Sequence, residues 1–261
     1  MPEETTFPLA QALQEIRRSR VRAVSPALLF LTALLIRKSR VRAADRALIL
    51  LAALLGAHTR VGAEKNAVAL TFDDGPDREL EDFLKLLEGA GARGTFFVVG
   101  EHVERDPGKL REIVSRGHEV AVHCYHHRNH LHLSPRQTVD DMRRAKAVIE
   151  DASERATRCF RPPGGMFNAT SWIEASRQGW ERVLWSRSGR DWSAQATLES
   201  VAQRIGRPEA GDVILLHDSN RYAAPGSRHA TLGALPIILE TLSSLEFQVR
   251  PVGELLNGRR R

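Results

Sequence analysis

The sequence contains only two cysteines in 261 residues, which excludes a scaffold held together by disulfides. It also lacks a long hydrophobic run. The longest apolar runs, at 27–36 and 47–57, have 10 and 11 residues, about half of the roughly 20 that a helix needs to cross a bilayer. Apolar residues make up 42% and charged residues 27%. These values exclude a disordered, collagen-like or polytopic membrane chain and leave a globular protein.

The second feature that most of the chain lacks is an excess of one charge. The net charge is +6, but residues 1–65 hold eleven Lys/Arg and five Asp/Glu, so residues 66–261 hold 27 of each sign. A domain whose charges cancel has no broad basic surface of the kind that binds nucleic acid. We therefore expect no nucleic-acid partner.

The basic N-terminal quarter contains a tandem repeat. Residues 16–35 and 36–55 are identical at 13 of 20 positions, and each copy is a basic head followed by an apolar run. Three interpretations stay open. The segment is a signal peptide with cleavage near Gly62-Ala63, a pair of helices lying on an anionic membrane surface, or a poorly ordered extension or helices packed on the domain. The first two place the protein at the cell envelope, associated with the membrane or exported, and the third leaves a cytoplasmic location open.

From residue 66 onward, short apolar runs alternate with helical patterns. The alternation predicts a parallel α/β sheet, and six or more such units favour a closed barrel with a helical N-terminal extension. Strands are expected at Val68–Phe72, Thr95–Val99, Glu119–His123, Val183–Ser186, Val213–His217 and Phe247–Arg250. Helices are expected at 78–90, 109–116, 135–152, 170–178, 195–206 and 231–245. The third helix has a capping box formed by Ser134 and Gln137.

Polar side chains follow several of these strands, at the edge where a barrel of this kind carries its chemistry. His123 and His127 are four residues apart and Asp74 follows another strand. Two imidazoles and one carboxylate make a three-ligand site for a divalent ion with one position left open for water. Each residue alone is also explained by a solvated turn or a polar surface. Their occurrence together in barrel order favours a metal-dependent hydrolase.

The remaining polar residues supply the groups that such a hydrolase needs. Asp73 can accept a proton from water, and Arg161 is the candidate to orient that carboxylate. His217 can protonate a leaving group, with its basicity raised by Asp191. Taken singly, Arg161 is equally explained by a surface salt bridge and His217 by a hydrogen-bonded core histidine.

Together these segments resemble the polysaccharide deacetylase family, carbohydrate esterase family 4. Five segments match the family motifs in order over residues 66–257: TFDDGP, the His-x-x-x-His loop in GHEVAVHCYHH, FRPPGG, DW and ILLHD. The resemblance implies a distorted (β/α) barrel of about seven strands. It also implies removal of N-acetyl, or sometimes O-acetyl, groups from sugars with a divalent metal, Zn²⁺ first, with Co²⁺, Ni²⁺ or Mn²⁺ as alternatives.

The resemblance also assigns roles. Asp74, His123 and His127 match the metal ligands, Asp73 the general base and His217 the general acid; Arg161 and Asp191 match their partners. Trp192 and Leu215 match the walls of the acetyl pocket, and the backbone N–H of Gly164 matches an oxyanion donor.

This sequence departs from the family pattern at three positions. Gly164 stands where an aromatic residue is usual, Cys124 replaces Ser or Thr in the metal loop, and Ser188 stands where an Asp is common. We expect Cys124 and Cys159 to be reduced thiols, the first of them close to the metal.

The expected substrate is an N-acetylglucosamine polymer such as peptidoglycan, a chitin-like oligomer or an exopolysaccharide. The alternatives are an O-acetyl esterase, a lipid-linked sugar deacylase, and a carbohydrate-binding homologue that has lost turnover.

Overall fold

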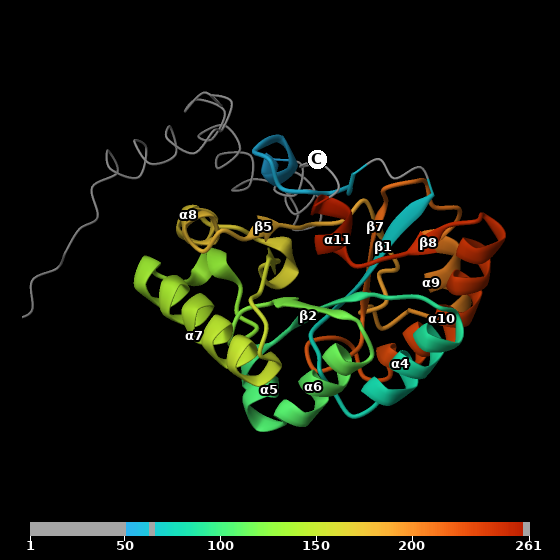
Figure 1. Cartoon of the computed structure of the whole chain (residues 1–261), viewed down its shortest axis with the longest axis horizontal. Helices are drawn as coiled ribbons and strands as arrows, with labels where there is room; N and C mark the ends of the chain where they lie inside the picture. Colours follow the sequence, from blue (N-terminus) through green and yellow to red (C-terminus); the bar gives the residue numbers. More distant parts are fainter. Residues whose placement is uncertain (1–50, 63–65, 258–261) are drawn as a thin grey trace, which may run out of the picture.

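Every pair of named strands in the sheet is parallel, as the alternation of strands and helices predicts. The computed structural model describes residues 51–62 and 66–257. The strands are β1 (Ala67–Asp73), β2 (Thr95–Val98), β3 (Glu119–Val122), β4 (Cys159–Phe160), β5 (Glu181–Arg182), β6 (Arg187–Ser188), β7 (Val213–His217) and β8 (Gln248–Val249). They follow the order β5-β4-β3-β2-β1-β7-β6, with β8 beside β1. This curved sheet, flanked by helices in Figure 1, confirms the predicted distorted (β/α) barrel.

Most of the helices lie outside the curved sheet and cover its outer face, whereas the last one, residues 252–257, packs against the residues that fill the barrel interior (Figure 1). They are α4 (Leu80–Gly89), α5 (Gly100–Arg105), α6 (Pro107–Ser115), α7 (Pro135–Ser153), α8 (Ala169–Arg177), α9 (Leu198–Ile205), α10 (Ser227–Ser244) and α11 (Val252–Asn257). Two short 3-10 turns, η1 (His130–His132) and η2 (Pro163–Gly165), lie in the loops after β3 and β4. The predicted capping box of α7 is present, because Ser134 accepts from the Gln137 N–H and Gln137 accepts from the Ser134 N–H.

The side chains of β1 alternate between two environments. Phe72 packs in the large core that includes helix residues, whereas Ala69 belongs to a smaller core with residues of other strands. Thr71 and Asp73 have the same parity as Ala69 and are buried, so they face the interior of the barrel. The same alternation on β7 places Leu215 and His217 on one face. The barrel interior is therefore apolar near the start of β1 and polar near its end.

The sequence prediction of a strand at Val183–Ser186 is wrong. In the structure β5 ends before this segment and β6 begins after it, and β5 and β6, the two ends of the sheet, do not pair. We call residues 183–186 the seam. Val183 and Leu184 are buried, which explains the strand-like pattern, but their carbonyls accept hydrogen bonds from Arg161 and not from a neighbouring strand. The barrel is therefore closed at the seam by the Arg161 side chain and not by pairing of β5 with β6.

Short elements account for the other differences from the prediction. The sequence did not indicate β4, β5, β6, α5 or α11, whereas the predicted ends of most other elements lie within a few residues of the observed ones. The start of α10 differs more, since this helix begins at Ser227 and not at 231. Two-residue strands and six-residue helices are too short to show a period of two or 3.6.

Part of the basic N-terminal quarter packs on the barrel. Ala52 and Ala57 are buried in a cluster with Trp172 and Leu184, and His58 bridges to Val183 beside the seam. Residues 1–50, which carry most of the tandem repeat, lie outside the described residues, so the three interpretations of this segment stay predictions. No helix among residues 51–62 and 66–257 is long and apolar enough to cross a membrane.

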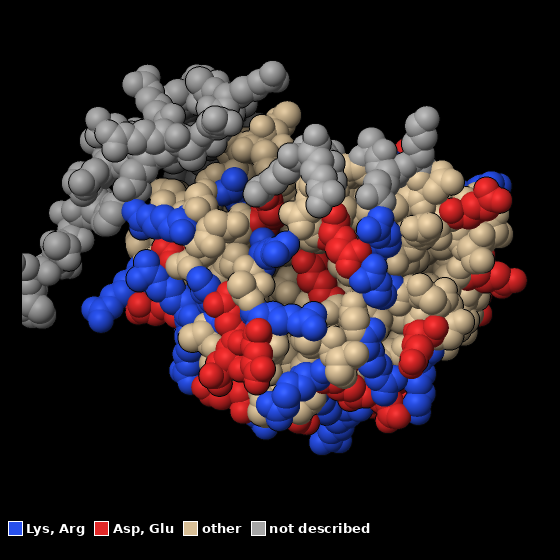
Figure 2. All heavy atoms as spheres, in the orientation of Figure 1, with Lys and Arg blue, Asp and Glu red and all other residues tan. Residues whose placement is uncertain are grey.

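The surface charges are mixed. On the face shown in Figure 2, Lys and Arg side chains are interspersed with Asp and Glu side chains. This arrangement agrees with the balance of 27 charges of each sign in residues 66–261.

Candidate active site

The predicted metal ligands come together at the carboxyl end of the sheet. Asp74 follows β1 in a tight turn, with a φ of 79°, and its Oδ1 lies 3.1 Å from His127 Nε2 and 3.4 Å from His123 Nε2. The ligand atoms of these residues all lie within 4.8 Å of one another. Asp74 Oδ1 is buried and has no hydrogen-bond partner among the described residues. An acceptor of this kind beside two imidazole nitrogens fits a bound cation.

Neighbouring groups prepare these side chains to bind a cation. His123 Nδ1 lies 2.7 Å from the Arg161 carbonyl and donates to it, so the ring is held with Nε2 facing Asp74. Burial alone would raise the pKa of Asp74, but the imidazoles of His123 and His127 hold it well below its usual range. The carboxylate is therefore ionised at neutral pH and able to bind a metal ion.

Asp73 is held by a buried arginine, as the sequence predicts. Arg161 has no exposed surface, and its guanidinium donates to Asp73 Oδ1 at 2.6 Å and to Thr71 Oγ1 at 3.0 Å. The same group donates to the carbonyls of Val183 at 3.2 Å and Leu184 at 3.0 Å. The surface salt bridge considered for Arg161 is therefore wrong. Asp73 Oδ2 lies 3.8 Å from His123 Nε2, so the carboxylate borders the metal-ligand group.

His217 and Asp191 form the second predicted pair. His217 Nδ1 lies 2.9 Å from Asp191 Oδ1, and the backbone N–H of His217 donates to Asp191 Oδ2 at 2.7 Å. Thr231, which the sequence analysis did not single out, donates to the same oxygen at 2.8 Å. Burial would lower the pKa of His217, but Asp191 raises it to about 10. The imidazole is thus a cation at neutral pH in the metal-free protein, with Nε2 able to donate a proton.

The residues predicted to bind the substrate are Trp192, Leu215 and Gly164. The Trp192 ring packs edge-on against the His217 ring at 5.4 Å between centroids, and Leu215 is buried two residues before His217 on the same face of β7. Gly164 is exposed in η2 with a φ of 62°. The Gly164 N–H donates no hydrogen bond to any described residue. An oxyanion donor needs an N–H that is available in this way. The roles of these residues stay predictions.

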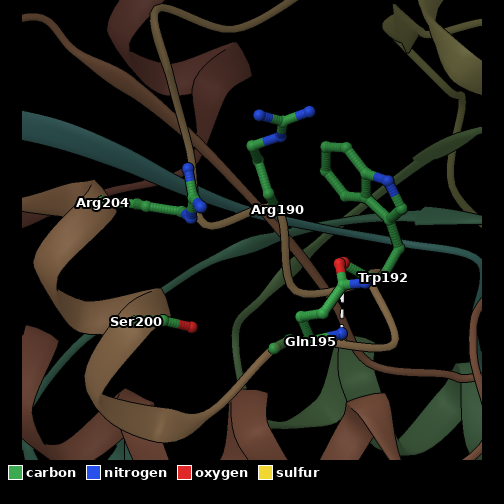
Figure 3. A pocket seen from close by; sticks show the side chains of 7 residues that line it. Arg190, Trp192, Gln195, Ser200 and Arg204 are labelled. Atoms are coloured by element: carbon green, nitrogen blue, oxygen red, sulfur yellow. Dashed lines mark hydrogen bonds between the residues drawn. The ribbon is translucent and has the colours of Figure 1, made fainter.

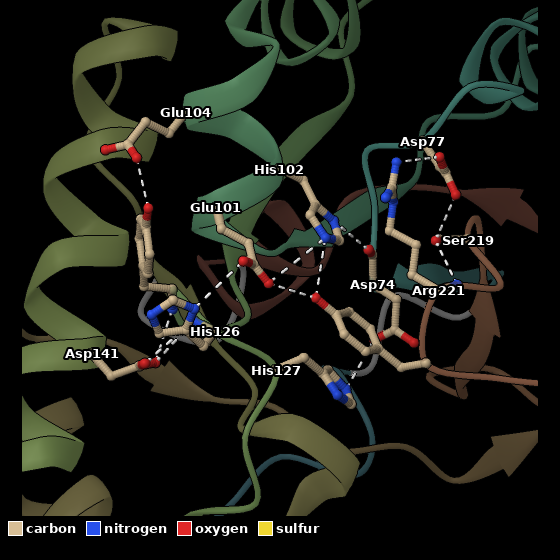
Figure 4. Close-up of polar contacts among 12 residues, drawn as sticks. Asp74, Asp77, Glu101, His102, Glu104, His126, His127, Asp141, Ser219 and Arg221 are labelled. Carbon is tan, nitrogen blue, oxygen red and sulfur yellow. Dashed lines mark hydrogen bonds and ion pairs between the residues drawn. The ribbon is translucent and has the colours of Figure 1, made fainter.

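The structure adds several residues to the site that the sequence analysis missed. Tyr222 stacks on His127 with ring centroids 4.1 Å apart, and its hydroxyl donates to Glu101 at 2.8 Å. Figure 4 shows where His127 and Glu101 lie beside Asp74. Asp218 is buried against Gly75, where a Cβ would lie 2.0 Å from Asp218 Oδ2, so only glycine fits in TFDDGP at this position. Tyr222 sits in a loop without a periodic pattern. Asp218 adjoins His217, and this adjacency was the one available indication.

The Cys124 thiol faces away from the predicted metal ligands. Its sulfur lies 3.0 Å from His130 Nε2, and Asp141 completes a second buried group with ligand atoms within 4.8 Å. Asp141 already accepts from the Tyr125 N–H at 2.9 Å and from Arg128 at 2.7 Å. Hydrogen bonds therefore account for this second group. Cys124 and Cys159 are both free and buried, as expected.

A carboxylate with two histidines, an arginine-held aspartate and an aspartate-bound histidine lie at one edge of the (β/α) barrel, and this set has the groups that a metal-dependent hydrolase needs. The profile of the family described as "Polysaccharide deacetylase" matches residues 60–183. The chain belongs to this family, carbohydrate esterase family 4, and is therefore a hydrolase of the polysaccharide deacetylase type.

Two relatives illustrate the sequence similarity. A peptidoglycan-N-acetylglucosamine deacetylase from Bacillus cereus is 32% identical over 192 residues, which cover 72% of this chain and 87% of the relative. A chitooligosaccharide deacetylase from Bradyrhizobium sp. is 30% identical over 200 residues, which cover 72% of this chain and 90% of the relative.

Solved structures support the same assignment. A family 4 carbohydrate esterase from Streptomyces lividans, in complex with acetate, superposes with a TM-score of 0.64 at 32% identity, covering 70% of this chain and 91% of that one. A family 4 pseudoenzyme from Bacillus anthracis has a TM-score of 0.68 at 26% identity, covering 76% of this chain and 67% of that one. The fold is thus shared by active and inactive members.

Proposed function

We propose that this protein hydrolyses N-acetyl groups of an N-acetylglucosamine polymer of the peptidoglycan or chitin-oligomer type and uses a divalent metal ion, Zn²⁺ first. Similarity to deacetylases with these two substrates supports the substrate class. The observation that carries the chemistry is the position of Asp74 Oδ1, which lies beside the imidazoles of His123 and His127. This oxygen has no hydrogen-bond partner among the described residues.

In this proposal Asp74, His123 and His127 hold the ion. When bound, the ion would supply Lewis-acid polarisation and lower the pKa of water toward 7. One carboxylate and two imidazoles suit Zn²⁺, and leave Co²⁺, Ni²⁺ and Mn²⁺ to be compared.

The chain's own residues then move the protons. Asp73, held in place by Arg161, accepts a proton from the attacking water as the new C–O bond forms. The Gly164 N–H stabilises the negative charge that develops on the carbonyl oxygen. His217 Nε2 donates a proton to the amide nitrogen as the C–N bond breaks, while Asp191 stabilises the imidazolium. The products are acetate and a free amine on the sugar.

The test is acetate release from N-acetylglucosamine oligomers and from peptidoglycan before chelation, after chelation, and after return of each metal. We expect chelation to lower the rate more than about a hundredfold, because a lost Lewis acid costs several kcal/mol of barrier. Zn²⁺ should restore it. The variant His127→Gln should bind less metal, whereas His126→Gln should not, since His126 contacts Glu101 instead.

A rate that chelation leaves unchanged, with full metal removal verified, would overturn the metal-dependent mechanism. Binding of the oligomers without acetate release at any metal loading would support the alternative of a carbohydrate-binding homologue. Release of acetate from acetylated xylan alone would support the O-acetyl esterase alternative.

A further inference from the structure

A cavity beside the candidate active site has no role in the proposed reaction. Its volume is about 410 Å³, and it is lined by Arg190, Trp192, Ser193, Gln195, Ala196, Ser200 and Arg204. These residues come from the loop after β6 and from α9 (Figure 3). Trp192 connects the cavity to the candidate active site, since it lines the cavity and its ring packs edge-on against the ring of His217.

The cavity is positively charged and its arginines are unpaired. No Asp or Glu is among its lining residues. Neither Arg190 nor Arg204 has a carboxylate within salt-bridge distance in the described ranges 51–62 and 66–257, whereas Arg187, in the same region, pairs with Asp212. Two guanidinium groups at one cavity repel each other unless an anion lies between or beside them.

The other polar groups of the cavity leave donors available. Gln195 Oε1 accepts from Ser193 Oγ at 3.0 Å, so the amide nitrogen of Gln195 is left to donate. Together with the planar guanidinium forks, this set recognises a carboxylate, which accepts two parallel hydrogen bonds from one arginine. Trp192, which is 37% exposed, adds an apolar face on which a sugar ring can pack.

We propose that this cavity is a subsite for a carboxylate-bearing substituent on a sugar next to the one that is deacetylated. The inference rests on the proposed function, and it directs that function toward an acidic polymer and away from a neutral one. In peptidoglycan this carboxylate has two sources, the lactyl ether of N-acetylmuramic acid or the peptide attached to it.

Three tetrasaccharides of alternating N-acetylglucosamine and N-acetylmuramic acid distinguish these sources. The first carries free lactyl carboxylates, the second carries the peptide, and in the third the lactyl carboxylates are converted to neutral amides. We expect the full-length protein to show a higher kcat/KM for at least one of the first two than for the third, by roughly tenfold at low salt. Added salt should reduce this ratio.

The variant Arg204→Gln should lower this ratio by roughly threefold, and its combination with Arg190→Gln should remove the preference. Arg207→Gln is the matched control, because Arg207 is exposed outside the cavity and the variant loses the same charge. Equal rates on all three substrates, or an unchanged ratio in Arg204→Gln, would overturn the subsite.

A binding measurement separates this outcome from failure of the proposed function. If no substrate releases acetate, the deacetylase proposal fails, but the affinities of the charged and amide tetrasaccharides for the Asp73→Asn protein still decide the subsite. A roughly tenfold weaker Kd for the amide supports it, and equal Kd values overturn it.

Discussion

Two consecutive aspartates at the end of β1 have different surroundings. Asp73 continues the strand and meets the Arg161 guanidinium, whereas Asp74 turns away with a positive φ and meets two imidazoles. A carboxylate paired with a buried guanidinium is held in one orientation, and a carboxylate beside two imidazoles can share a metal ion with them. The division of roles between base and ligand therefore follows from one turn of the backbone.

Separate substitution of Asp73 and Asp74 should distinguish the loss of catalysis from the loss of metal binding. In Asp73→Asn the amide oxygen still accepts from Arg161 but no longer accepts a proton. We expect kcat to fall by about a hundredfold or more with full metal content. Asp74→Ala should lose metal as well as activity. Acetate release and metal analysis of the purified proteins check both. A near-wild-type rate in Asp73→Asn would show that another group is the base.

The pH dependence should report the pair of His217 and Asp191. His217 acts as an acid only while protonated, and Asp191 raises its pKa from 6.5 to about 10 against the effect of burial. The activity should therefore fall as pH rises. A bound cation repels this proton, so the alkaline midpoint should lie between 6.5 and 10.

The variant Asp191→Asn removes the negative charge that stabilises the imidazolium. The alkaline midpoint of kcat/KM should then move down by about one pH unit or more. Asp151→Asn is the matched control, because it removes the same charge at an exposed position on α7, and it should leave the profile unchanged. The same alkaline midpoint in Asp191→Asn and the wild type would mean that His217 is not the group being titrated.

At the scale of the elements, the feature that positions the site is the seam. The two ends of the sheet are joined by residues 183–186, whose N–H groups donate to Phe160, His58 and Val213 carbonyls. Two of their carbonyls accept from Arg161, which also stacks over the Phe97 ring at 4.0 Å. The arginine therefore replaces part of the strand pairing that a closed barrel would have.

A substitution at Arg161 should thus affect stability as well as catalysis. Lysine cannot donate to two carbonyls and to Asp73 in the same planar geometry. Arg161→Lys should lower the free energy of unfolding by about 2–4 kcal/mol, since buried acceptors lose their partners. Urea unfolding measures this change. Arg158→Lys, at an exposed position just before β4, should be within about 0.5 kcal/mol of the wild type. An equally small change in Arg161→Lys would contradict the structural role.

The sequence predicted the long elements and the polar residues at strand ends, because periodicity over five or more residues and the parallel topology determine them. It failed at the seam, since the burial of Val183 and Leu184 looks the same whether their carbonyls meet a strand or a side chain. Thr231 and Tyr222 reach the site from segments far along the chain. Only the fold brings them there, so no local pattern indicates them.

At the scale of the whole molecule, the described part of the N-terminal quarter belongs with the barrel. Arg60 pairs with Asp212 at 3.2 Å, and Ala52, Ala57 and Val61 are buried. The segment 51–62 contacts β5, the seam and the start of β7 through these residues and His58. The segment 51–62 therefore packs on the barrel next to the seam, where the two ends of the sheet meet.

Two truncations test how much of the N-terminal quarter the catalytic domain needs. Removal of residues 1–50 should leave kcat unchanged, because every candidate site residue lies after residue 66. Removal of residues 1–65 should lower the free energy of unfolding by about 2 kcal/mol, since it exposes the apolar surface that the segment covers. Thermal unfolding and acetate release measure these effects. A loss of activity on removal of residues 1–50 would show that the extension takes part in the reaction.

We propose that the segment 16–57 associates the protein with a membrane surface, as its basic heads and apolar runs indicate. The contact is made by the part before residue 51, because Ala52 and Ala57 are buried against the barrel. The full chain should then sediment with anionic vesicles, and the protein without residues 1–50 should stay in the supernatant. High salt should weaken the interaction. Equal sedimentation of the two proteins would contradict this proposal.

Arg161 binds both Asp73 and the carbonyls of the seam. This has a consequence for how inactive members of this family evolve. A descendant that no longer needs its base would still lose stability by changing this arginine, so we expect the arginine to persist in proteins that have lost turnover. Its presence is therefore poor evidence that a homologue is active. Asp74 and His217 touch no carbonyl of the seam, and genetic drift at these positions is the better mark of a decayed enzyme. Both are intact in this chain.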